Sequence, residues 1–229
     1  MLDRLRTPFF LVALVLIFIA VVVEVGSSGK LQQASAAAAG LNAAAPGKGI
    51  LCLAFVDGLL LYTSLLMGLS LIVPERIQGR VQGVASLIFA VLLIIGAFLT
   101  LLAVFQLLIL MVTLLLAPIF GTLAYFACFG SFNVDGARAT LGMAMTLKLL
   151  FAACLVLAHQ RFLQNKGLVL LIATSLVATF VVEFLHALVP GFLVSITDAI
   201  GGLIALVLAL IWAVLLAISS VFSIVKAVV

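Results

Sequence analysis

A few ionisable side chains lie inside long apolar segments, where a charge needs a partner or water. Asp57, Lys148 and Glu183 are each flanked on both sides by apolar residues. A charged group at membrane depth costs about 3 kcal/mol on insertion scales, so such groups form pairs inside a bundle or mark ion and proton paths. These three residues are the first candidates for chemistry in this chain.

A polar stripe is predicted on the apolar segment that carries Glu183. Four polar residues recur there at spacings of four, four and three residues, which is the period of one helix face. They are Ser175, Thr179, Glu183 and His186. Because the rest of the segment is apolar, we expect this face to contact protein or water.

Lys148 and Glu183 are expected to form a buried ion pair between two neighbouring helices. Their segments are joined by a short connection, and helical rise places the two residues ~16 Å and ~9 Å from the same membrane face. A lysine side chain closes much of that difference. The pair can act as structural glue, in which case it only holds the helices together.

The alternative is that these residues line a path for a proton, an ion or a polar solute, with Glu183 and His186 as the titrating groups. Asp57 belongs to this path if it lies in the same half of the membrane as Glu183. That condition depends on how the chain is divided into membrane spans.

The longest uncharged stretch decides this division. Between Val81 and Val134 the chain has no Asp, Glu, Lys, Arg or His. About 20 apolar residues make a helix that crosses a bilayer, and a soluble fold cannot bury an apolar segment of this length. The sequence therefore predicts an integral membrane protein.

The composition agrees with a single transmembrane domain that covers residues 1–229. Of these 229 residues, 67% are hydrophobic and 8% are charged. The net charge of +4 comes mostly from short connections, so it bears on topology and indicates no nucleic-acid partner. We expect an all-α polytopic helical bundle with six transmembrane helices, seven being possible, and short loops.

The predicted spans are about 8–25, 50–73, 84–116, 137–158, 167–189 and 200–225. Residues 26–49 are predicted to form a low-complexity extracytoplasmic loop, with Glu24 at the outer edge of the first span. Residues 118–132, which begin at Pro118, are either a re-entrant segment or a seventh span.

The positive-inside rule favours a single crossing of residues 84–132. This arrangement places seven basic residues on the cytoplasmic side against three outside, whereas a double crossing gives five on each side. The seven are Arg4, Arg6, Arg76, Arg80, Arg161, Lys166 and Lys226, and the three are Lys30, Lys48 and Arg138. We expect a multi-pass protein of the cell (inner) membrane with a cytoplasmic N-terminus.

The sequence contains no motif that indicates an enzyme, a metal site or a cofactor. It lacks the GxSxG, HExxH and GxxxxGK[ST] patterns, and the three cysteines have no CxxC or CxxH spacing. We therefore predict a channel- or transporter-type protein, without a cofactor, that lies in the lipid bilayer as a homo-oligomer or with other membrane subunits. The alternative is a non-catalytic structural or assembly subunit of a larger membrane complex.

Overall fold

The structure, a computed structural model, describes residues 7–39, 48–70, 75–129, 134–188 and 193–228. These residues form mainly α-helices, together with the short 3-10 helix η2 and short turns, and there is no strand among them. The helices are α1 (Thr7–Ala39), α2 (Lys48–Ser70), α3 (Glu75–Leu116), α4 (Phe120–Phe129), α5 (Val134–Ala158), η2 (Gln160–Gln164), α6 (Lys166–Leu188) and α7 (Val194–Val228). Within the described ranges, six helices are long and apolar enough to cross a membrane. The predicted helical membrane bundle is confirmed.

Helix is the form that such apolar segments take in lipid, because each backbone N–H and C=O group then finds its partner within the same segment. The six long helices are α1, α2, α3, α5, α6 and α7. Their lipid-facing sides carry large apolar residues, for example Leu92, Ile109 and Phe222, which are each more than half exposed in the isolated chain.

The uncharged stretch forms one long helix and one short one. α3 has 42 residues and α4 has 10. By helical rise α4 is only ~15 Å long, which is half of the hydrocarbon thickness, so it cannot cross on its own. The structure therefore agrees with a single crossing between residues 84 and 132 and with six spans, and the break at Pro118 is confirmed.

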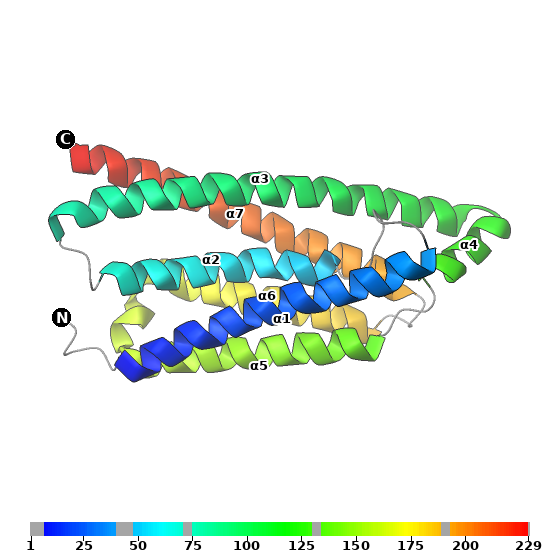
Figure 1. Cartoon of the computed structure of the whole chain (residues 1–229), viewed down its shortest axis with the longest axis horizontal. Helices are drawn as coiled ribbons and strands as arrows, with labels where there is room; N and C mark the ends of the chain where they lie inside the picture. The colour runs from blue at the N-terminus through cyan, green and yellow to red at the C-terminus, as the bar shows by residue number, and fades with distance from the viewer. Residues whose placement is uncertain (1–6, 40–47, 71–74, 130–133, 189–192, 229) are drawn as a thin grey trace.

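The turn between α3 and α4 requires an unusual backbone conformation. Ile119 has a φ of 53°, which is in the left-handed region that β-branched residues rarely adopt. A Cβ added to Gly121 would meet Ala117 Cβ at 2.1 Å and Leu114 O at 2.7 Å, so only glycine fits there. This turn folds α4 back along the end of α3 (Figure 1).

The helices run alternately up and down the bundle. Figure 1 shows the start of α1 and the end of α7 at the same end of the bundle as η2, the end of α2 and the start of α3. Arg80 Nη2 donates a hydrogen bond to Ala227 O at 3.4 Å, which joins the start of α3 to the end of α7. In the middle of the bundle, α2 packs against α1, α3, α6 and α7, and α1 also packs against α5.

The boundaries differ from the predicted ones most strongly in α1. This helix continues from Thr7 to Ala39, so most of the predicted loop 26–49 is helical, and residues 40–47 lie outside the described ranges. The Ala-rich sequence after Gly26 has high helix propensity, which explains the extension. Glu24 is consequently not at the edge of a span, and its side chain is fully buried.

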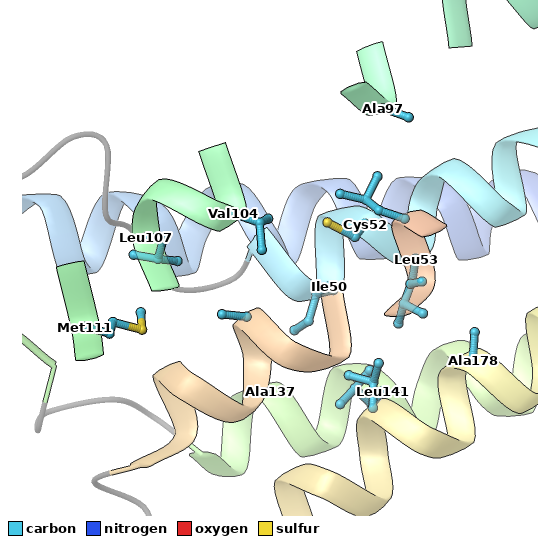
Figure 2. Packing of buried hydrophobic residues seen from close by; sticks show 14 of the residues in the cluster. Ile50, Cys52, Leu53, Ala97, Val104, Leu107, Met111, Ala137, Leu141 and Ala178 are labelled. Atoms are coloured by element: carbon cyan, nitrogen blue, oxygen red, sulfur yellow. The ribbon is translucent and has the colours of Figure 1, made fainter. Parts of the chain in front are cut away.

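Two apolar clusters fill the bundle, one toward each end. The α4-side cluster includes Leu53, Leu141 and Val182, and Figure 2 shows its contributions from α2, α3, α5 and α6. The η2-side cluster includes Phe10, Leu60, Phe151 and Leu171. The space between the two clusters holds the buried charges.

The six-span arrangement predicts which exposed positions share a side of the membrane. In a variant without native cysteines, cysteines at Arg80 and Gln164 should react with an impermeant maleimide from one side, and a cysteine at Ala139 only from the other. All three positions are exposed and lie near helix ends. Labelling of positions 80 and 164 from opposite sides would establish a seventh crossing and contradict this structure.

Candidate functional site: a buried charge cluster between two apolar layers

The ammonium group of Lys148 lies at the centre of the buried charges. Lys148 Nζ is 2.9 Å from Glu24 Oε1 and 2.7 Å from Asp57 Oδ2. The same ammonium donates a hydrogen bond to Thr179 Oγ1. Four helices, α1, α2, α5 and α6, therefore converge on one positive charge.

The hydroxyl groups of α6 orient this arrangement. Ser175 Oγ donates to Asp57 Oδ1, and Thr179 Oγ1 donates to Ser175 O at 2.9 Å. Because the Thr179 hydrogen is committed to that carbonyl, its oxygen is left to accept from Lys148. We call Glu24, Asp57, Lys148, Ser175 and Thr179 the central charge cluster.

The central charge cluster is shielded from solvent. The exposed fraction is 0% for Glu24 and Asp57 and 1% for Lys148. In their ionised forms, two carboxylates share one ammonium, which leaves a net charge of −1. Glu24 Oε2 has no hydrogen-bond partner among the described residues. A buried carboxylate oxygen in this state is costly, and a proton or a further cation would satisfy it.

The cluster lies near mid-depth of the bundle. By helical rise, Asp57 is ~14 Å and ~20 Å from the two ends of α2. On α2 it lies between Leu53 of the α4-side cluster and Leu60 of the η2-side cluster. On α5, Lys148 lies between Leu141 and Phe151 of the same two clusters. The charges thus form a polar layer with an apolar layer on either side.

A second buried polar group lies toward the α4 end, and we call it the distal polar group. Its members are His186 of α6, Ser195 and Asp198 of α7, and Tyr125 of α4. His186 Nε2 is 3.6 Å from Asp198 Oδ1, and the Tyr125 hydroxyl and Ser195 Oγ are 2.8 Å apart. His186 Nδ1 is 2.8 Å from Val182 O, and because a carbonyl only accepts, Nδ1 must carry a hydrogen.

The structure brings together four of the six predicted site residues. Asp57, Lys148, Ser175 and Thr179 are all members of the central charge cluster. His186 belongs to the distal polar group. The predicted stripe on α6 is therefore buried at three of its four positions.

The predicted pair of Lys148 with Glu183 is wrong, because the acidic partners of Lys148 are Glu24 and Asp57. At 100° per residue, position 183 is about 80° around the helix from Ser175, whereas position 186 is only about 20° away. Glu183 is half-buried and lies on the side of α6 toward α5, where its Oε1 is 3.8 Å from a Cβ added to Gly142.

Glu24 is the cluster member that the sequence reasoning missed. The first span was expected to end at Val25, which placed Glu24 at the membrane surface. The helix propensity of the residues after Gly26 was the available signal, since a longer first helix moves Glu24 to mid-depth.

Neither a metal site nor a similarity to known proteins assigns a function to these polar groups. In the described part of the chain, no three His, Cys, Asp or Glu side chains come together as a metal site would require. Comparisons with protein-family models, curated proteins and solved structures found no match. The two buried polar groups are therefore the features of the described chain that bear on its function.

The cluster geometry predicts a strong dependence on Lys148. Lys148→Met should lower stability by about 3 to 5 kcal/mol, because it leaves two carboxylates buried without their cation. The triple variant Glu24→Gln, Asp57→Asn, Lys148→Met should recover most of this loss. Thermal unfolding in detergent, followed by the fluorescence of the single tryptophan, Trp212, measures both effects.

A matched control separates the observed partners from the predicted one. Combining Lys148→Met with Glu183→Leu should give no recovery, because Glu183 does not contact Lys148. If that double variant were as stable as the parent and the triple variant were not, the observed cluster would be contradicted.

Proposed function

We propose that this protein is a channel- or transporter-type protein of the inner membrane, and that it moves an ion, a proton or a small solute through its buried polar residues. The central charge cluster is the observation that carries this proposal. An ionisable residue inside a membrane bundle is a functional candidate by default, because it is expensive to keep there. In this cluster two carboxylates are buried with one ammonium group, so one negative charge is left unbalanced.

The position of the cluster supports the same function. Binding sites of membrane transporters lie near the middle of the bilayer, where access can alternate between the two sides. The central charge cluster lies at mid-depth, and the α4-side and η2-side clusters separate it from both ends. A site enclosed in this way can hold a charged species without a continuous open pore.

The distribution of basic residues supports a cytoplasmic N-terminus. Arg80, Arg161, Lys166 and Lys226 belong to helix ends on the same side of the bundle as the start of α1. Basic residues accumulate on the cytoplasmic side of a membrane protein.

We also propose that the chain is not an enzyme, since its sequence carries no catalytic motif.

Transport through the cluster is tested in liposomes. The purified parent should dissipate a gradient of protons, of sodium or potassium, or of a small neutral solute, each measured with its own indicator. The triple variant Glu24→Gln, Asp57→Asn, Lys148→Met should be folded but inactive, because the groups that bind the moving species are gone. Glu183→Gln is the control and should retain the parent's activity.

Two results would reject this function. If the parent dissipates none of these gradients, the protein is not a channel or transporter. If the triple variant is as active as the parent, the cluster only holds the helices together.

A second candidate function, a structural or assembly subunit, is favoured by the α3–α4 hairpin. α3 has 42 residues and is ~63 Å long by helical rise, about twice the hydrocarbon thickness. The tip of the hairpin exposes Leu116 at 76%, Ile119 at 74% and Phe120 at 83%. An apolar tip beyond the rest of the bundle is suited to contact with another membrane subunit.

The composition of the particle after mild detergent extraction tests this second function. Different chains should co-purify with the parent, and Ile119→Asn should release them while leaving the chain folded. Asparagine tolerates the positive φ of this position, so the turn is kept and only the apolar contact is lost. A parent that migrates as a monomer would contradict the assembly function.

A further inference from the structure

The distal polar group is buried as completely as the central charge cluster. His186, Ser195 and Asp198 are each 1% exposed, and Tyr125 is 0% exposed. Three separate helices, α4, α6 and α7, contribute these side chains. The bundle therefore holds a second buried polar site, separate from the central charge cluster, whose burial also costs free energy.

The two sites lie on one line along α6. Ser175, Thr179 and His186 are all on the buried face of this helix. Thr179 contacts Lys148, and His186 is ~10 Å further along by helical rise. Ser195 and Asp198 are three residues apart on α7, so their side chains lie about one helical turn apart on the same face of this helix. Ser195 contacts Tyr125, which extends the line of polar groups to α4.

The space between the two sites is closed by a tight helix contact. A Cβ added to Gly201 of α7 would lie 2.9 Å from Val182 Cγ2 and 3.4 Å from Val182 Cβ. Val182 is on α6 between Thr179 and His186, and both Val182 and Gly201 are buried. A hydrated metal ion or an organic solute does not fit through such a contact without a large separation of α6 and α7.

A cavity of about 420 Å³ is lined by residues of α2, α6 and α7, including Leu59, Leu171 and Trp212. Leu59 is two residues from Asp57 and therefore lies on the opposite side of α2, and no member of the central charge cluster lines this cavity. Asn165 lines the outer part of the same cavity, next to η2. The apolar η2-side cluster, which includes Leu59 and Leu171, thus lies between this cavity and the central charge cluster.

We infer that the transported species is a proton and that His186, paired with Asp198, is its second binding site. This inference rests on the proposed transport function and names the species for it. An imidazole ring can accept a proton on one nitrogen and release it again, and Nε2 is the ring nitrogen available for this, since Nδ1–H is held by Val182 O. A proton bound at Nε2 gives an imidazolium that the Asp198 carboxylate stabilises.

The transfer requires only water as a carrier. A proton leaves a carboxyl group of the central charge cluster, which becomes a carboxylate, and passes through water to His186 Nε2 when the Val182–Gly201 contact opens. Loss of that proton toward the α4 end returns the imidazole to its neutral form. A proton taken up from the solution at the η2 end then re-forms the carboxyl group, so each cycle moves one proton and returns both sites to their starting forms.

The inference is tested with liposomes that contain a trapped pH indicator. A potassium gradient with valinomycin sets the membrane potential, and the parent should move protons at a rate that does not change when sodium replaces an inert organic cation outside at constant external potassium. His186→Asn should reduce the proton flux to that of empty liposomes. The asparagine amide can keep the hydrogen bond to Val182 O, but it has no proton acceptor in the place of Nε2.

Two more variants keep this test decisive. Asp198→Asn should also lose the flux, and it serves as the second variant if His186→Asn does not fold. Glu183→Gln is on the same helix but outside the buried face, and it should conduct protons as the parent does. Thermal unfolding of each variant in detergent separates lost transport from lost structure.

The outcomes distinguish this inference from the proposed function. If His186→Asn and Asp198→Asn conduct as the parent does while the triple cluster variant is silent, the second site is wrong and transport stands. If the parent moves sodium, potassium or a neutral solute instead of protons, the identity of the species is wrong and transport stands. If the parent moves nothing, both proposals fail.

Discussion

The burial of Lys148 with two carboxylates constrains the rest of the bundle. Removing an ammonium group from water costs far more than a single contact returns, so its partners must all be within hydrogen-bonding distance at once. Glu24, Asp57 and Thr179 meet this requirement from three other helices. A shift of any of these helices by one residue along its axis would break one of the contacts and leave a charge unpaired in an apolar environment.

The apolar layers on either side cannot impose such a constraint. In a membrane, leucine and valine side chains are as well solvated by lipid as by each other, so packing between helices is only weakly directional. The α4-side and η2-side clusters contribute shape and close contact, whereas the polar layer fixes the register of α1, α2, α5 and α6. The Tyr125–Ser195 and His186–Asp198 contacts do the same for α4, α6 and α7.

Apolar length and charge placement were sufficient to predict the class of the protein and its six spans. The burial of Asp57 and Lys148 followed from the same reasoning, because a charged residue inside an apolar span faces the interior of the bundle and not the lipid. The choice of partner did not follow. It depends on which helices are neighbours, and the contact of α1 with α5 brings Glu24, instead of Glu183, to Lys148.

The angular position of Glu183 shows a second limit of sequence reasoning. Spacings of three and four residues both resemble a helical period, but two successive spacings of four accumulate an offset of about 80°. Ser175 and His186 share a face, while Glu183 falls beside it.

The side of the membrane that each loop faces stays a prediction, as does the identity of the membrane.

The chain order of the charged residues has a consequence for biogenesis. Glu24 and Asp57 belong to α1 and α2, and Lys148 belongs to α5, so both acidic residues leave the ribosome well before their cation. Until α5 is synthesised, neither acidic helix can reach its final depth with an ionised carboxylate without burying an unpaired charge. Until the lysine helix arrives to complete the bundle, the two acids of α1 and α2 therefore need a proton or another partner in place of Lys148.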